Sequence, residues 1–294
     1  MNDSLPRNEL ISARFPSTNL ALVYADCTEA AKALEKAHLC GPAAGRALAE
    51  VLAGVSLLSA ETLQESEMVS LKFDVPGPIQ SVFAEASDQG RLRGFPKKKI
   101  FDELDGRESL SAEDLYGVHA RVQVMRSVPG KILANSMAPC APASVASGLR
   151  AYFAQSLQRQ AAFLIRVRMG ADHYVESARG MLVERMPDGD GDAFARVRNA
   201  LAPLDAESLL DGSRDLSSLC GSLGLSDGVF TTVRPLAFGC RCSQERIEGA
   251  LASVPESDLA EMIGEAHPLR LFCHMCGKEY DVSVDRLREL LTNR

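Results

Sequence analysis

The chain has 294 residues, of which 46% are hydrophobic and 24% charged, and its formal net charge at pH 7 is −7. This length fits one or two domains, and the composition is that of a globular protein, which excludes a disordered or fibrous chain. The acidic balance also argues against a broad nucleic-acid surface, which is normally basic, so we predict no nucleic-acid partner.

The beginning of the chain predicts neither export nor membrane insertion. Its first ten residues, MNDSLPRNEL, are polar and acidic where a signal peptide has a basic start and an apolar stretch. The most apolar helical segment, Ala47 to Leu63, is interrupted by Glu50 and Glu61 and is expected to be too short to span a bilayer. We therefore expect a cytoplasmic protein with no membrane partner.

Residues 1–187 are predicted to form an N-terminal α+β domain with an antiparallel sheet. Helices are expected over Thr28 to Lys36, with Thr28 as N-cap, over Gly45 to Leu63, and over Ala143 to Gln158. The basic run Arg91 to Lys99 is expected to be a solvated loop. Alternating apolar residues predict strands over Met68 to Phe73, Ile79 to Ala86, Val118 to Arg126, Phe163 to Arg168, Tyr174 to Ser177 and Gly180 to Glu184.

Residues 188–236 are predicted to be a metastable helical linker. The Asp-rich run that opens it could suggest a calcium loop, but Ala193 stands where such a loop needs glycine and Asn199 where it needs glutamate. We therefore expect a turn. The helical segments that follow are short and are interrupted by proline and glycine, and short helices are marginal without tertiary support. Such a linker would be ordered only by docking onto its neighbours.

Residues 237–294 hold four of the eight cysteines as two tight pairs, Cys240-Arg-Cys242 and Cys273-His-Met-Cys276, with thirty residues between them. Helices are expected over Ser243 to Ala252, Pro255 to Gly264 and Ser283 to Leu291. A domain this small rarely has enough core of its own and commonly needs a metal or disulfides.

The two cysteine pairs predict a Zn²⁺ site, because four thiolates complete the tetrahedron that structural Zn²⁺ prefers. An iron–sulfur centre is also compatible with the ligand type. His267 and His274 lie nearby and would allow a Cys₃His variant, but four thiolates already fill the coordination sphere, so we leave both out. A metal-bound thiolate is also oxidisable, and each pair offers a second thiol with which to form a disulfide. Sequence alone allows three pairings of four cysteines.

The other cysteines and the histidines predict no catalytic residue, and we expect no enzyme activity. Cys27, Cys40, Cys140 and Cys220 have no partner spacing and are expected to be small buried apolar residues, although Cys220 in the linker merits attention. Two other functions compete with a redox switch. One is an adaptor with a purely structural zinc; the other is a thiol oxidoreductase that uses Cys273 and Cys276, although no thioredoxin-like context surrounds that pair.

The segments Phe238 to Arg246 (FGCRCSQER) and Phe272 to Tyr280 (FCHMCGKEY) closely resemble the zinc region of the 33 kDa heat shock protein family, the redox-regulated molecular chaperones of the bacterial cytosol. A less dense resemblance covers nearly the whole chain. It runs through Gly45 to Leu48, Gly77-Pro78, Arg93 to Phe95, Tyr152 to Ser156 and Met181 to Pro187.

This resemblance implies that Cys240, Cys242, Cys273 and Cys276 bind one Zn²⁺ in the reduced, inactive protein. It further implies that oxidative stress, often with heat, forms the disulfides Cys240–Cys242 and Cys273–Cys276, releases zinc and unfolds the zinc domain and linker. The active form would be an ATP-independent holdase for unfolded or partly folded client proteins, commonly a homodimer.

The chain departs from the family pattern in the first domain. Leu157-Gln158 replaces the usual Glu-Gln, Lys131 to Asn135 replaces a Tyr-Gln-Gly-Ile-Val-like strand, and Arg179-Gly180 replaces the usual Gly-Gly. These changes bear on client range and dimerisation and leave the four cysteines intact.

Overall fold

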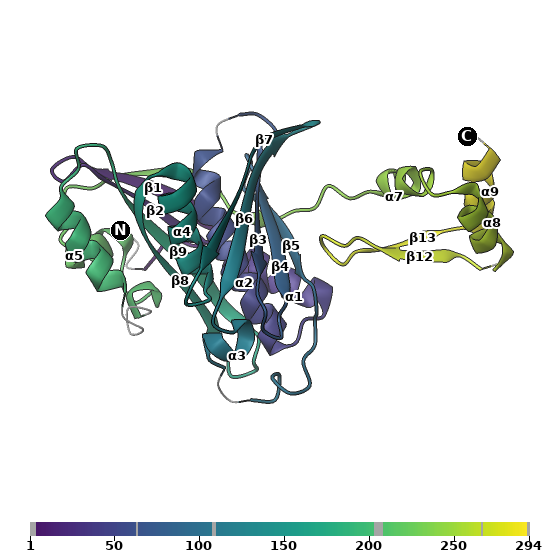
Figure 1. The fold of residues 1–294 in the computed structure, drawn as a ribbon, viewed down its shortest axis with the longest axis horizontal. Helices are drawn as coiled ribbons and strands as arrows, with labels where there is room; N and C mark the ends of the chain where they lie inside the picture. The colour runs from purple at the N-terminus through teal and green to yellow at the C-terminus, as the bar shows by residue number, and fades with distance from the viewer. Residues whose placement is uncertain (1–3, 63, 108–109, 203–207, 266, 293–294) are drawn as a thin grey trace. The chain divides into compact units, whose positions relative to one another are not determined.

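The computed structural model describes residues 4–62, 64–107, 110–202, 208–265 and 267–292. The chain divides into two compact units, Met1–Gly239 and Cys240–Arg294. Figure 1 follows the chain from purple at the N-terminus to yellow at the C-terminus.

Two sheets form the framework of the first unit. The first sheet has the strand order β10-β1-β2-β9-β8, and all neighbouring strands are antiparallel. Its strands are β1 (Glu9–Phe15), β2 (Leu20–Asp26), β8 (Gln160–Met169), β9 (Val175–Arg185) and β10 (Val229–Pro235). The pairing of β10 with β1 therefore joins the end of the expected linker region to the first strand of the chain.

The second sheet has the order β11-β5-β4-β3-β6-β7, in which only the short β11 is parallel to its neighbour. Its strands are β3 (Met68–Asp74), β4 (Ser81–Ser87), β5 (Arg91–Pro96), β6 (Ala120–Val128), β7 (Lys131–Cys140) and β11 (Ala237–Phe238).

The helix α2 (Pro42–Leu58) holds the two sheets together, because it contacts β8 and β9 of the first sheet and β3, β4 and β5 of the second. With the 3₁₀ turn η1 (Ser59–Glu61) it forms one helical stretch of 20 residues that is long and apolar enough to cross a membrane, yet 83% of its apolar window is buried inside the protein. The expectation that this segment is too short was therefore wrong, and its burial identifies it as the core helix.

Before residue 188, the described residues form three further helices. They are α1 (Thr28–His38), α3 (Ala112–Tyr116) and α4 (Val145–Tyr152), and the last continues into the π-helical turn η2 (Phe153–Leu157).

The described residues of the segment 188–236 pack on the first sheet. They form α5 (Gly191–Leu201), α6 (Leu216–Ser222) and β10, and the Asp190 carboxylate caps α5 by accepting hydrogen bonds from the Asp192 and Ala193 backbone N–H groups. Apolar side chains of both helices join one core cluster with residues of β1, β2, β8 and β9. The Asp-rich run therefore forms a turn, as predicted, and it also supplies a helix cap that was not predicted.

The second unit is a small α+β arrangement. It contains the hairpin β12 (Leu269–Phe272) and β13 (Glu279–Val282) and the helices α7 (Gln244–Leu251), α8 (Glu256–Gly264) and α9 (Val284–Thr292). The buried side chains of Leu251, Leu259, Val282 and Leu287 form an apolar core cluster in this unit.

The predicted α+β class with antiparallel pairing is confirmed, and several local predictions are corrected. The described part of the first unit has two sheets where one was expected, and strands β1, β2, β5, β10, β11, β12 and β13 were not predicted. The basic run is not wholly a loop, since its first six residues form β5. The two strands expected over residues 174–177 and 180–184 are one strand, β9.

The predicted cap of the first helix is also wrong. Thr28 lies inside α1, and its hydroxyl accepts a hydrogen bond from the Ala178 backbone N–H at 3.0 Å. The Asp26 carboxylate accepts from the Thr28 N–H instead. The threonine is therefore the first residue of α1 and ties it to strand β9, whereas the N-cap position is Cys27.

Candidate metal centre

The four paired cysteines converge in the second unit. Cys240 and Cys242 lie just before α7, while Cys273 and Cys276 lie in the tight turn between β12 and β13. In that turn the carbonyl of Cys273 accepts from the N–H groups of Cys276 and Gly277, and Gly277 has a positive φ of 71° that favours glycine. This bend directs both thiols of the pair to the same side.

The spacing of the sulfur atoms fits a tetrahedral ion. All four Sγ atoms lie within 4.8 Å of one another, with Cys240 and Cys273 at 3.8 Å and Cys242 and Cys276 at 3.5 Å. A tetrahedron with metal–sulfur bonds of about 2.3 Å has sulfur–sulfur edges of about 3.8 Å. The arrangement can therefore hold a metal ion, and within the described part of the chain this group of ligands contains neither His267 nor His274.

Burial differs among the four thiols. Cys273 is 9% exposed and Cys276 is 3% exposed, whereas Cys240 and Cys242 are partly exposed. Burial raises the pKa of the Cys273 and Cys276 thiols above its ordinary value. A bound cation opposes this effect, because a coordinating thiol is deprotonated outright. Burial and a bound cation therefore act in opposite directions on these two thiols.

Two neighbours shape the site beyond its ligands. The Tyr280 hydroxyl on β13 donates a hydrogen bond to the Cys242 Sγ at 3.0 Å, and that bond raises the pKa of Tyr280. The Ser243 hydroxyl, next to Cys242 in the chain, caps α7 by accepting from the Arg246 N–H. Sequence reasoning missed Tyr280 as a member of the site, although its place four residues after Cys276 was a usable signal.

The resting geometry does not select the predicted disulfides. Two close sulfur–sulfur contacts join one cysteine of each pair, Cys240 with Cys273 and Cys242 with Cys276. The pairings Cys240–Cys242 and Cys273–Cys276 stay predictions about the state after the ion leaves.

The remaining cysteines are in the first unit, apart from this cluster. Cys27, Cys40 and Cys220 are buried and Cys140 is partly buried. Burial raises the pKa of Cys40 and of Cys220 to about 12, so both thiols are protonated at neutral pH. Cys220 lies in the core cluster that the segment 188–236 shares with the first sheet. These cysteines behave as small apolar residues.

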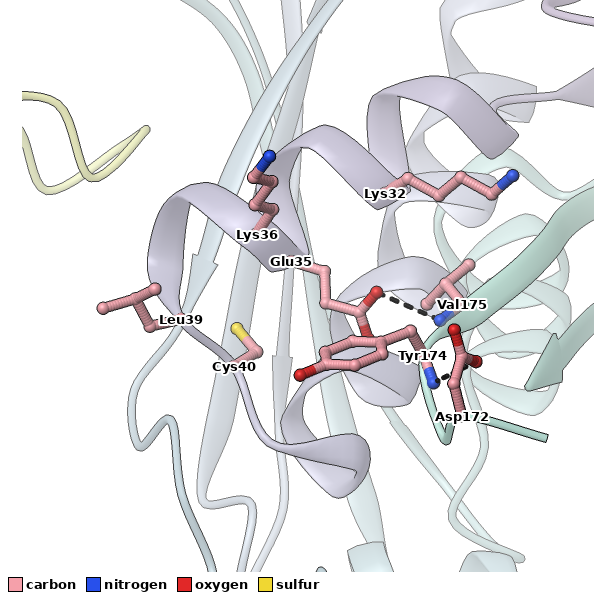
Figure 2. A pocket seen from close by; sticks show the side chains of 8 residues that line it. All are labelled: Lys32, Glu35, Lys36, Leu39, Cys40, Asp172, Tyr174 and Val175. Carbon is pink, nitrogen blue, oxygen red and sulfur yellow. Dashed lines mark hydrogen bonds between the residues drawn. The ribbon is translucent and has the colours of Figure 1, made fainter. Parts of the chain in front are cut away.

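The first unit also contains a pocket that the sequence did not predict. Figure 2 shows this pocket of about 540 Å³, between α1 and the turn that precedes β9. Its buried Glu35 accepts a hydrogen bond from the Val175 N–H with one carboxylate oxygen, while the other has no hydrogen-bond partner. Burial raises the pKa of Glu35 to about 7. The other lining residues are Lys32, Lys36, Leu39, Cys40, Asp172 and Tyr174.

Comparison with known proteins gives concordant matches. The family model described as Hsp33 protein matches residues 8–283. A 33 kDa chaperonin of Thermus thermophilus is 29% identical over 289 residues, covering 93% of this chain and 83% of the relative. A 33 kDa chaperonin of Levilactobacillus brevis is 27% identical over 272 residues, covering 91% of this chain and 92% of the relative.

The fold has a counterpart among solved structures. The crystal structure of the 33 kDa chaperonin (heat shock protein 33 homolog) from Thermotoga maritima superposes with a TM-score of 0.86. The match covers 98% of this chain and 99% of that chain at 22% sequence identity, and at this identity it bears on the fold alone.

Proposed function

The chain belongs to the Hsp33 family, and from this premise we propose that it is a redox-regulated, ATP-independent molecular chaperone that holds unfolding proteins. The relatives named 33 kDa chaperonin support a chaperone. The observation that carries the redox regulation is the gathering of Cys240, Cys242, Cys273 and Cys276 within 4.8 Å in a unit with a small apolar core. We propose that oxidation of these four sulfur atoms unfolds such a unit.

We propose Zn²⁺ as the bound ion, one per chain, because four thiolates form the donor set that this borderline-soft cation takes in structural sites. When bound, Zn²⁺ keeps the thiolates deprotonated and stabilises the fold of the unit; for finger-like peptides this binding is worth about 10–16 kcal/mol at pH 7.

Oxidation by a peroxide would convert each pair of thiolates to a disulfide in two steps. A cysteine thiolate attacks the peroxide, so that an S–O bond forms, the O–O bond breaks and hydroxide leaves. The second thiolate of the pair then displaces hydroxide from the sulfenic acid, so that an S–S bond forms and the S–O bond breaks. Each disulfide thus consumes one peroxide and two thiolates, and two disulfides, proposed as Cys240–Cys242 and Cys273–Cys276, leave no thiolate for the ion.

The client-binding surface would come from the first unit. Side chains of the segment 188–236, Leu210, Leu216 and Leu219 among them, cover apolar residues of the first sheet such as Leu22 and Tyr24. If this metastable segment were released, contiguous apolar surface would be exposed, and such patches bind other proteins. A holdase acts by binding the unfolded state, so turnover is not required and we propose no enzyme activity.

We further propose that the clients are unfolded or partly folded proteins of the cytoplasm, that the oxidised form is a homodimer, and that neither a membrane nor a nucleic acid is a partner. The net charge of −7 favours the last proposal. Cys273 and Cys276 lie in the turn of a two-stranded hairpin, which disfavours the competing thiol oxidoreductase, because such a pair is expected near a thioredoxin-like βαβ unit.

A single experiment tests this function. The zinc-loaded protein is treated with peroxide at elevated temperature, zinc release is followed with a chelating dye, and light scattering of a denaturing client is recorded. We expect zinc release and suppression of client aggregation to rise together. Zinc release without suppression would instead indicate an adaptor with a structural metal. Cys240→Ser should weaken zinc retention, whereas Cys140→Ser, the control in the first unit, should leave it unchanged.

A further inference from the structure

The Tyr280 hydroxyl is placed against one particular ligand of the candidate metal centre. Tyr280 lies on β13 opposite Leu271 of β12 and is only 6% exposed. Its hydroxyl donates to the Cys242 Sγ at 3.0 Å, and the Lys278 ammonium lies 5.0 Å from the centre of its ring. The strand pairing and the ring contacts therefore hold the phenol in place.

Cys242 is less buried than Cys276, the most buried of the four cysteines. Cys276 is 3% exposed, whereas Cys242 is partly exposed. Burial therefore shields Cys276 from dissolved peroxide more than it shields Cys242, which leaves Cys242 in need of a different protection. A hydrogen bond can provide it, because withdrawing electron density from a thiolate lowers its intrinsic nucleophilicity.

We propose that Tyr280 is a positioning residue that holds the Cys242 thiolate in the metal site and slows its attack on peroxide, and so sets the oxidant threshold of the switch. This inference rests on the proposed function. The reaction restrained is the first oxidation step, in which the Cys242 sulfur forms an S–O bond, the O–O bond of the peroxide breaks and hydroxide leaves. Outer hydrogen bonds to metal ligands commonly change metal affinity by about 10–100-fold.

The variant Tyr280→Phe isolates the hydroxyl, since it keeps the ring, its burial and the Lys278 contact. The control is Tyr174→Phe, which removes a tyrosine hydroxyl from an exposed position in the first unit. Both variants and the unaltered full chain are loaded with zinc and their metal content is measured. Zinc release under a fixed peroxide concentration is then timed, and early sulfenic acid at Cys242 is trapped with dimedone and quantified by mass spectrometry.

We expect Tyr280→Phe to bind one zinc with affinity about tenfold lower, to release it several times faster under peroxide, and to accumulate more trapped sulfenic acid at Cys242. Cobalt-loaded protein gives a second readout, because loss of the hydrogen bond should shift the thiolate-to-cobalt absorption band to longer wavelength. The control should match the unaltered protein in every measurement.

Equal release rates, equal trapping at Cys242 and an unchanged cobalt band in Tyr280→Phe would overturn the role of Tyr280 and leave the proposed function intact. Failure of the unaltered protein to bind metal would overturn both. Full oxidation should make Tyr280→Phe and the unaltered protein equally effective in suppressing client aggregation, because the hydroxyl controls the rate of switching and not the active state.

Discussion

The two units of the chain are stabilised in different ways. The first has two sheets joined by the buried helix α2 and encloses ion pairs such as Asp26–Arg179. The second has a small apolar cluster around Leu259 and Leu287 and ion pairs that are mainly exposed, such as Arg270–Glu279. On the proposed function, the contrast teaches that one chain can combine a body that folds by burial with an appended unit whose fold would depend on four sulfur atoms.

The largest expected effect comes from removing the metal. Chelation under reducing conditions, or Cys276→Ser, should unfold Cys240–Arg294 and leave most of the first unit folded, because the lost binding energy is about 10–16 kcal/mol. Amide hydrogen exchange measured unit by unit checks this. Cys140→Ser, a partly buried cysteine of the first unit, is the control. If the amide protons of the second unit stay protected from exchange without metal, that unit does not depend on metal for its fold and the contrast between the two units fails.

The buried ion pair of the first unit should give the next largest effect. The Arg179 Nε donates to the Asp26 carboxylate at 2.8 Å and its Nη1 donates to the Leu210 carbonyl at 2.8 Å. Arg179 therefore links the first sheet to the segment 188–236. Arg179→Met leaves the 1% exposed Asp26 carboxylate without its cation.

We expect Arg179→Met to lower the free energy of unfolding of the first unit by about 3 kcal/mol, because breaking a buried pair leaves an uncompensated charge. Exchange protection should also fall around Leu210. Arg168→Met is the matched control, since its pair with Glu176 is exposed and worth at most about 0.5 kcal/mol. Equal losses in the two variants, measured by denaturant unfolding, would show that the buried link contributes nothing special.

The third effect depends on pH and belongs to the pocket in Figure 2. Burial raises the pKa of Glu35 in the folded state to about 7 from the ordinary value of 4.5. Between these pH values the folded state keeps a proton that the unfolded state has lost. Stability therefore falls as pH rises from about 4.5 to about 7, and the ionised carboxylate costs about 2 kcal/mol above that range.

Glu35→Gln should remove this slope, so that the variant is more stable than the unaltered protein by about 2 kcal/mol at pH 8 and equally stable near pH 4.5. Thermal unfolding across this pH range measures the difference. Glu29→Gln, in the exposed first turn of the same helix, is the control. Parallel pH profiles for Glu35→Gln and the unaltered protein would mean that Glu35 does not titrate in this range.

The parts of the structure that sequence could predict are those set by local spacing. The Cys-x-Cys and Cys-x-x-Cys pairs predicted the four-cysteine cluster because each pair turns within a few residues, and helix α7 lies within the helix expected over Ser243 to Ala252. Strand β10 was missed because its side chains are exposed and only its pairing with β1, more than two hundred residues away in the chain, makes it a strand.

Charged residues also made two features, strand β5 and the buried Glu35, hard to predict from the sequence. In β5 the buried Leu92 and Gly94 alternate with arginines, and one of these, Arg93, pairs with Glu85 on the neighbouring strand, so its charge belongs to the sheet and not to a solvated loop. No local pattern marks Glu35 as a buried residue of α1. Its burial depends on the Val175 N–H, and its second carboxylate oxygen occupies space that a side chain at Gly45 would fill.

The smallest expected effect comes from the serine N-cap, an interaction that occurs in both units. The hydroxyls of Ser144 and Ser243 cap α4 and α7 by accepting from the backbone N–H groups of Ser147 and Arg246. Each Ser→Ala change should cost about 1 kcal/mol. In the first unit Ser144→Ala should lower the unfolding free energy by that amount with or without metal.

In the second unit the same loss should appear as weaker metal binding, because folding of that unit and metal binding are one equilibrium. About 1 kcal/mol corresponds to roughly fivefold lower zinc affinity, which competition with a chelator can measure. Zinc affinity should stay unchanged in Ser144→Ala, so this variant serves as the control. Unchanged affinity in Ser243→Ala would mean that the unit is already folded before the ion binds, and the division of the chain into a self-supporting body and a metal-dependent switch would not hold.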